Sequence, residues 1–582
     1  MPSETDYPQT GLKLPKTLAR PADIFTDDQS LNHWLQQLPV ADAKESAQIL
    51  VKSLSDANSS DLNSIKRLKI LETVQPLIED IVPVLSKRYL PSKFPLTTKE
   101  YEQAQLTCKL YLEMATGYKQ AFAQQIIEDK VSQQKSAHVI ALHRCMFYLQ
   151  KTLFLSAIIY DDYPPTLWHE THQLFSYSSI NKLDRIPIEN SVTGQKPSTV
   201  KQLYKQSLLF AVVSPFQMAQ SEIIKLIKLL PELDNQVTLV VMRADDKPIE
   251  FGFFMNLNSD DMPLHIAQIP DGFKSSVLTL QTGRLLQRLL AAGSSEDVPL
   301  QQVNRHLRSV LLKNLGYKPH RNLQRDTYKA KLDLVSGLHK VHSYIDGHDS
   351  DNNLAQALTD KPVIIRTDHH ATDNKAEFDL QDVEVLTKGA SGLHNEHHQE
   401  NLVIDILLNK DKPIDASDLF HPAEEKYLSN VMQNMATSIN KSDNGYCLDW
   451  SNKNLPAISI GDVVCIKPEE GQQNFTLAVT RWMKNTGRNF LVGIEVLSKD
   501  CHAILFKAKK VSAKHHPKTE YQGLLLARQE NKPAELIIEQ DQFNNNDTII
   551  LTSDSHQKIL LKLNHQIEST GLLDRFEIEY LQ

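Results

Sequence analysis

One short polar stretch, Asn440-Lys441-Ser442-Asp443-Asn444-Gly445, is the most informative part of this sequence. It has the pattern N-x-S-x-x-G, in which polar residues and a glycine are typical of a tight turn. Short runs of apolar and β-branched residues follow it along the chain, with glycine at the bends, and such runs predict β-strands. They are Tyr446-Cys447-Leu448, Ile460-Gly461-Asp462-Val463-Val464, Val479-Thr480-Arg481-Trp482 and Val492-Gly493-Ile494-Glu495-Val496.

An arginine pair with the spacing R-x-x-x-R lies upstream, in Arg321-Asn322-Leu323-Gln324-Arg325. Pro319 disfavours a helix just before this pair, and the β-like run 331–338 follows it, so the pair precedes a predicted strand. A second pair with the same spacing, Arg284 and Arg288, falls in an amphipathic helical pattern. In a helix this spacing only places both side chains on one face, and we interpret that pair as a solvated surface.

This order of arginine pair, first strand, N-x-S-x-x-G turn and late Val-Gly-Ile-Glu strand resembles the PilZ domain, the small β-barrel by which many bacterial proteins bind cyclic di-GMP. The resemblance implies that the ligand contacts Arg321, Arg325, Asn440, Ser442 and Gly445. Arginine binds phosphate or the guanine O6/N7 edge with a bidentate fork. Asparagine and serine offer directional hydrogen bonds, and glycine permits close approach. The resemblance implies no catalytic residue, no metal and no cofactor, with cyclic di-GMP as the ligand.

The distance between the two motifs departs from the family pattern, which has a few tens of residues there. In this chain more than 100 residues separate Arg325 from Asn440. A polar stretch rich in Asp, Asn and His, from about 346 to 430, accounts for the difference, and we interpret it as an insertion in the barrel. The closure entropy of a loop grows only logarithmically with its length, so the pocket can form across the insertion.

Composition and periodicity divide the 582 residues into successive parts and predict a multidomain α+β protein. Helical periodicity in the N-terminal half predicts an antiparallel helical array. We expect a PilZ-type antiparallel β-barrel and a further β module after it. The expected parts are an extended arm (1–30), the helical array (31–235), a small β patch with helices (236–315), the interrupted PilZ-like barrel (316–510) and the C-terminal β module (511–582).

Local patterns give more detailed expectations. Apolar residues recur at helical spacing between 62 and 85, and two prolines in that segment are expected to kink the helix or to break it in two. The runs 237–241 and 251–254 are expected to pair as a hairpin. The segment 276–293 is expected to be helical.

The overall composition limits the classes of function. A formal net charge of −8 gives no electrostatic reason to expect nucleic-acid binding. The five cysteines form no C-x-x-C pair, and their odd number fits reduced thiols in the cytoplasm. The N-terminus is polar and acidic, unlike a signal peptide, and the most apolar stretch, 149–160, is too short to span a bilayer. We therefore expect a cytoplasmic protein without a membrane span.

Three hypotheses for the function follow. The first is a cyclic di-GMP receptor that couples ligand binding to a surface for an unknown protein partner on the helical half. The second is an adaptor or scaffold whose PilZ domain acts without a ligand. The third, an enzyme, would need Asp368-His369-His370 or the histidine cluster 394–398 to hold metals, and we expect no enzyme. Trp482 is expected in the barrel core, with Arg481 as its exposed neighbour, rather than as a base-stacking pair.

Overall fold

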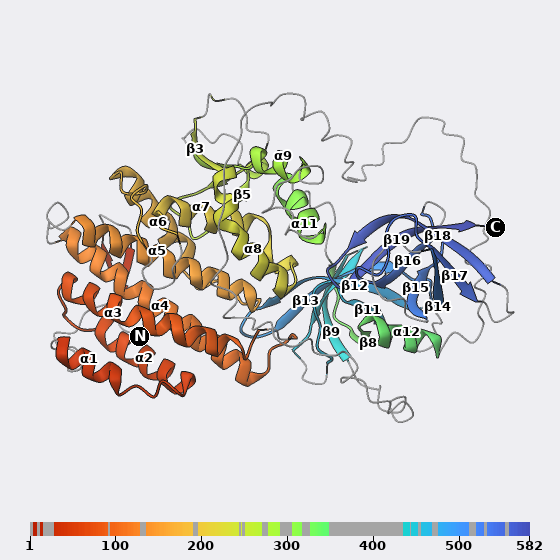
Figure 1. Ribbon diagram of the computed structural model, residues 1–582, viewed down its shortest axis with the longest axis horizontal. Helices are drawn as coiled ribbons and strands as arrows, with labels where there is room; N and C mark the ends of the chain where they lie inside the picture. Colours follow the sequence, from red (N-terminus) through yellow and green to blue (C-terminus); the bar gives the residue numbers. More distant parts are fainter. Residues whose placement is uncertain are drawn as a thin grey trace.

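The computed structural model places a helical half, a middle β-barrel and a second β-barrel one after another along the long axis of the molecule (Figure 1). This architecture confirms the multidomain α+β fold. The structure describes residues 4–7, 12–15, 28–90, 93–127, 135–189, 196–243, 246, 251–269, 277–291, 305–316, 326–347, 435–442, 444–451, 455–467, 475–510, 520–528, 532–552 and 558–581.

The helical half is stabilised by apolar helix faces that pack into one core. Polar side chains cap the helix starts. Asp42 accepts hydrogen bonds from the backbone N–H groups of Lys44 and Glu45 at 2.9 and 3.0 Å, and Thr199 forms a capping box with Gln202. The helices are α1 (Asp28–Gln36), α2 (Ala43–Asn58), α3 (Ser64–Ser86), α4 (Thr98–Ile127), α5 (Lys135–Ile158), α6 (Leu167–Ile180), α7 (Val200–Val212) and α8 (Gln220–Leu233), with short 3-10 turns η2 (Pro215–Gln217) and η3 (Asp234–Gln236). Before them, β1 (Glu4–Tyr7) pairs with β2 (Leu12–Pro15).

The segment with two prolines forms one helix, α3, which contains both Pro76 and Pro83. The prolines therefore do not break it, although each removes a backbone donor. Val74, Ile78 and Ile81 on this helix are buried in the core. Packing of that face outweighs the missing hydrogen bonds, because most helical stability in a protein comes from tertiary contacts.

The most apolar stretch of the sequence lies in α5, which packs against α4. Leu149 and Leu153 are buried there, as expected for a core helix.

A buried ion pair joins two other helices. Lys119 on α4 and Glu170 on α6 lie 2.5 Å apart, and both side chains are more than nine-tenths buried. Within the ranges that the structure describes, none of the helices combines the length and the apolar composition needed to cross a membrane.

A four-stranded antiparallel sheet follows the helices. Its strands, in spatial order, are β3 (Thr238–Met242), β6 (Val277–Gln281), β4 (Gly252–Met255) and β5 (Leu264–His265), with the turn η4 (Ile266–Gln268) after β5. The expected hairpin of β3 and β4 is wrong, because β6 lies between them. The expected helix 276–293 is wrong at its start, since short apolar runs fit either period and only α9 (Gly283–Ala291) is helical. The helix α11 (Arg305–Gly316) completes this part.

The middle barrel is antiparallel and closes on itself. Its ring has the order β10-β13-β12-β11-β8-β9, and β9 pairs with β10 to complete it, while β7 adds to β9 alone. The helix α12 (Leu338–Asp346) follows β8, and the expected insertion lies, from residue 348 on, outside the described residues. The strands are β7 (Asp326–Thr327), β8 (Lys331–Ser336), β9 (Met435–Ser442), β10 (Gly445–Asp449), β11 (Val463–Ile466), β12 (Thr476–Asn485) and β13 (Phe490–Ser498).

The second barrel is also closed, with the order β14-β15-β16-β19-β18-β17. Residues 501–510, expected in the first barrel, form β14 and belong to the second one because they pair with β15 and β17. A separate apolar core fills this barrel, with Phe506 and Phe576 among its fully buried side chains. The strands are β14 (Cys501–Lys510), β15 (Tyr521–Leu526), β16 (Glu535–Glu539), β17 (Thr548–Thr552), β18 (Lys558–Ser569) and β19 (Leu573–Leu581).

The middle barrel contacts both of its neighbours closely. Toward the helical half, Phe94 and Ile458 exchange backbone hydrogen bonds at 3.2 and 2.8 Å, and the Phe94 ring stacks on Phe490 with centroids 6.0 Å apart. Toward the second barrel, only Lys499 and Asp500 separate β13 from β14. There a shared apolar core joins α12 and the outer face of β11 to β14 and β15. The middle barrel is thus held between the other two parts (Figure 1).

Candidate ligand-binding site

The N-x-S-x-x-G motif forms a tight hairpin between β9 and β10. Ser442 is paired with Gly445, and Ser442 Oγ lies 3.5 Å from the Gly445 carbonyl oxygen. The backbone N–H of Val496 on β13 donates to the carbonyl of Asn444 at 2.9 Å. The turn expected from the sequence is therefore tied to the next strand of the barrel.

Gly445 is required by the packing of the strands. A Cβ added there would lie 2.2 Å from the carbonyl oxygen of Ile494, a backbone atom of β13. Ile494 cannot move away easily, because it is paired with Tyr446 on one side and Thr480 on the other. The glycine of the motif thus lets β10 lie against β13 at this point.

The strand register gathers polar groups on one face of the barrel. Ser442, Gly445 and Glu495 form one row across β9, β10 and β13, and directly opposed residues of antiparallel strands point to the same face. Asn440 points to this face as well, because side chains alternate along a strand. Thr327 on β7 stands opposite Asn440. The structure therefore brings Asn440, Ser442 and Gly445 together on the outer face.

Lys441, between the two polar motif residues, belongs to the opposite face. Its Nζ lies 5.5 Å from the ring centroid of Tyr328 and 5.4 Å from that of Tyr446. Leu448, the next residue on the Tyr446 face of β10, is fully buried in the barrel interior. The cation–π contacts therefore stabilise the hairpin from the inner side and leave the outer face to the motif residues.

Arg321 and Arg325 lie outside the residues that the structure describes. Asp326, the residue after Arg325 in the chain, begins β7 and is paired with Lys441 of the motif strand. The residue that follows the arginine segment in the chain thus lies beside the N-x-S strand, although more than 100 residues separate the two in sequence. Arg284 of the second arginine pair is exposed on α9.

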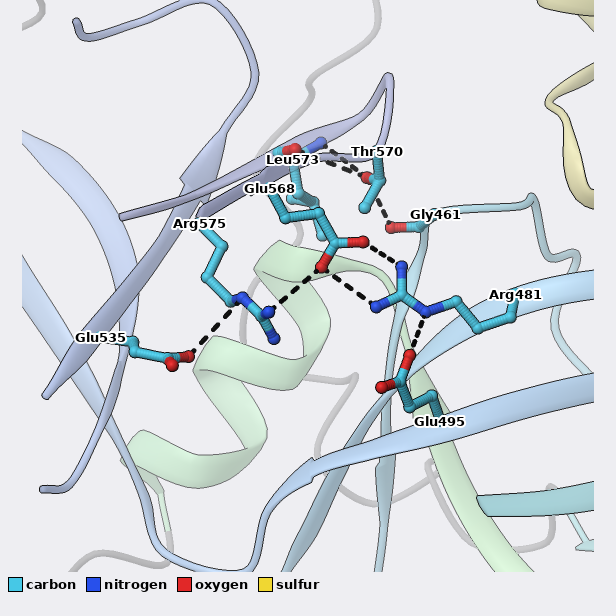
Figure 2. A network of polar contacts seen from close by, with 8 residues as sticks. All are labelled: Gly461, Arg481, Glu495, Glu535, Glu568, Thr570, Leu573 and Arg575. Atoms are coloured by element: carbon cyan, nitrogen blue, oxygen red, sulfur yellow. Dashed lines mark hydrogen bonds and ion pairs between the residues drawn. The ribbon is translucent and has the colours of Figure 1, made fainter. Parts of the chain in front are cut away.

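Arg481 on β12 connects the site face to the second barrel (Figure 2). Its Nε donates to Glu495 Oε2 at 2.5 Å, and its Nη1 and Nη2 donate to the two carboxylate oxygens of Glu568 on β18. Arg575 approaches the same carboxylate at 3.5 Å and Glu535 at 3.6 Å. The expectation that Arg481 is an exposed neighbour of the core is wrong, because its side chain is only 30% exposed and its three nitrogen atoms are bonded to two carboxylates.

The charges of this network support one another. Burial alone would lower the pKa of the Arg481 guanidinium, but hydrogen bonds and charges from Glu568 and Glu495 raise it above its usual value. Burial likewise opposes ionisation of Glu568, yet Arg481 lowers the pKa of that carboxyl below its usual range. Arg481 and Glu568 are therefore both charged at neutral pH, as an ion pair between two barrels requires.

Trp482 also departs from the expectation. It is half-buried rather than in the core, and it lies against Gly493, where an added Cβ would be 1.9 Å from its indole Nε1. Glu495 was not singled out from the sequence, although a carboxylate two residues after the glycine of a predicted strand is a usable signal. No local signal points to Glu568. The Asp368-His369-His370 string and the cluster 394–398 lie outside the described residues.

A closed antiparallel barrel whose N-x-S-x-x-G hairpin adjoins the strand after an R-x-x-x-R segment defines the PilZ class of domain. Comparison with family models agrees: the middle PilZ domain of the cyclic-di-GMP receptor FimW matches residues 253–502, and the N-terminal domain of the same receptor matches residues 29–245. The chain therefore belongs to the PilZ family, in the group that the FimW models describe.

A curated relative extends this likeness over the whole chain. The cyclic-di-GMP receptor FimW of Pseudomonas aeruginosa is 23% identical over 593 residues, which cover 99% of this chain and 94% of that protein. No solved structure matches the chain significantly.

Proposed function

We propose that this protein is a receptor for cyclic di-GMP, which binds on the outer face of the middle barrel at the N-x-S-x-x-G hairpin. The observation that carries the proposal is the pairing of β7 with β9. Through it, the segment with the R-x-x-x-R pair continues directly into a strand beside the polar motif residues. Membership of a family whose models are described as a cyclic-di-GMP receptor supports the same ligand.

Each motif residue has a role in this proposal. Arg321 and Arg325 bind the ligand phosphates or a guanine edge through their planar forks. Asn440 and Ser442 form hydrogen bonds with a guanine or a phosphate, while Gly445 keeps the face open. Binding makes and breaks no covalent bond, so the proposal includes no catalytic residue, cofactor or metal. The protein acts in the cytoplasm, where its five buried thiols remain reduced.

The same geometry suggests how binding reaches the helical half. Residues 317–325 connect α11 to β7 in the chain. A ligand that engages both arginines fixes this connection relative to the barrel, and such a constraint shifts the balance between orientations of the two parts. The helical half then presents an altered surface to a protein partner.

Titration calorimetry with cyclic di-GMP tests the receptor. The wild type should bind, and Arg321→Ala/Arg325→Ala should weaken binding by about 100-fold or more, since each charge-assisted hydrogen bond contributes about 1.5–3 kcal/mol. The matched control is Arg284→Ala/Arg288→Ala, which removes a pair of the same spacing from α9 and should bind like the wild type. Absence of binding by the wild type would contradict the receptor and support a ligand-independent adaptor.

A further inference from the structure

Glu495 shares the face of the candidate site but belongs to neither motif. It ends the cross-strand row that begins at Ser442 and passes through Gly445. Its side chain is 47% exposed, so its carboxylate is open to a ligand on this face. Figure 2 shows that carboxylate turned toward Arg481 at the boundary between the two barrels.

The row leaves a gap suited to a flat base. Neighbouring strands are about 4.8 Å apart, so the backbones at Ser442 and Glu495 stand roughly 10 Å from each other, with only the glycine between them. In the next row, Gly493 stands opposite Cys447 and is covered by the Trp482 indole, so the gap is limited to the row of Ser442, Gly445 and Glu495. A purine ring therefore finds a hydroxyl at one side of the gap and a carboxylate at the other.

We infer that Glu495 reads the guanine base of the ligand and makes the site selective for guanine over adenine. Guanine presents two adjacent donors, N1–H and the N2 amino group, and an ionised carboxylate accepts two parallel hydrogen bonds. Adenine presents an acceptor, N1, in place of the guanine N1–H, so the carboxylate repels it. The inference rests on the proposed function and specifies which group of the site recognises the base.

Arg481 is the positioning residue for Glu495. It holds Oε2 of Glu495 at 2.5 Å while Glu568 of the second barrel binds the other end of its guanidinium. A carboxylate has about four lone-pair sites, so the bonded oxygen keeps capacity for a base. The second barrel, which reaches the site through Glu568, thereby completes the recognition of guanine.

The first test is Glu495→Gln, titrated by calorimetry with cyclic di-GMP and with cyclic di-AMP. Glutamine keeps the size of the side chain but replaces one acceptor by a donor. We expect cyclic di-GMP to bind about tenfold more weakly or worse, and the preference for it over cyclic di-AMP to shrink by a similar factor. Glu579→Gln, an exposed carboxylate on β19, is the matched control and should retain both affinities.

The second test is Arg481→Lys, alone and with Glu495→Gln. Lysine keeps the charge but cannot bridge two carboxylates as a planar fork does. The single variant should lose preference for cyclic di-GMP, and it should lose no further preference in the Glu495→Gln background. A merely structural role of Arg481 would instead weaken both dinucleotides equally in both backgrounds and would count against the inference.

The outcomes separate this inference from the proposed function. If the wild type binds cyclic di-GMP and Glu495→Gln keeps both its affinity and its preference, the inference fails and the receptor stands. If the wild type does not bind, both fail. Thermal unfolding of each variant checks that the variant is still folded, so that a loss of affinity for cyclic di-GMP can be assigned to the site.

Discussion

Gly445→Ala separates the structural role of the motif glycine from its role toward the ligand. The added Cβ would lie 2.2 Å from the Ile494 carbonyl oxygen, about 1 Å closer than an ordinary carbon–oxygen contact allows. That oxygen belongs to a strand that is paired on both sides. The methyl group can therefore be accommodated only if β10 separates locally from β13.

Two estimates agree on the size of the effect. Overpacking of a well-packed site costs about 1–3 kcal/mol, and loss of two or three backbone hydrogen bonds costs about 1 kcal/mol each. We therefore expect a destabilisation of about 3 kcal/mol. At roughly 2–4 °C per kcal/mol for a unit of this size, the thermal midpoint should fall by roughly 6–12 °C.

Thermal unfolding of the protein without ligand measures this effect. Gly283→Ala is the matched control, because a Cβ at that position of α9 has nothing closer than 3.9 Å, and the change should be neutral or slightly stabilising. If Gly445→Ala unfolds within 2 °C of the wild type and only loses affinity for cyclic di-GMP, the reasoning from strand packing is refuted.

Three further predictions concern stability. Gly493→Ala should destabilise the fold by about 1–3 kcal/mol, because the added Cβ would overlap Trp482. Trp482→Ala in the same chain should restore part of the loss, and an unchanged thermal midpoint of Gly493→Ala contradicts this prediction. Lys119→Met should lower the free energy of unfolding in urea by about 3–5 kcal/mol, because it leaves the buried carboxylate of Glu170 without its lysine partner. A loss below about 1 kcal/mol would refute this prediction. The pKa of Glu568 is lowered in the fold. The ionised Glu568 therefore adds its full contribution to folding stability above the usual glutamate pKa of about 4.3, and this contribution is lost as the pH falls through the lowered pKa. Glu568→Gln should therefore be less stable at pH 7 and converge with the wild type in acid, and parallel midpoint–pH curves would disprove this.

Local chemistry explains what the sequence predicts well. The polar string at 440–445 places a turn between two apolar runs, and the structure forms a hairpin there. Helical spacing in the N-terminal half likewise yields helices, because each apolar face needs only a neighbouring face to pack on. The proline-containing α3 shows that such packing can override a local breaker.

Long-range pairing explains what the sequence does not predict. β6 inserts between β3 and β4, and no pattern in either run specifies a third strand between them. Arg481 finds Glu568 only because the second barrel packs on the outer face of the first. A charged residue next to a tryptophan has the same local pattern whether solvent or another domain covers it. The positions of Arg321 and Arg325 remain a prediction.

The two-residue connection between β13 and β14 has a mechanical consequence. A connection of only Lys499 and Asp500 is too short for one barrel to rotate about the other. The apolar cluster that the two barrels share would also be exposed to water if the barrels separated. The two barrels should therefore unfold together, in a single transition, as one rigid unit. Any movement that carries a signal must then occur at the boundary with the helices, where the stacked rings of Phe94 and Phe490 and the ion pair of Lys484 with Asp162 join the middle barrel to the helical half.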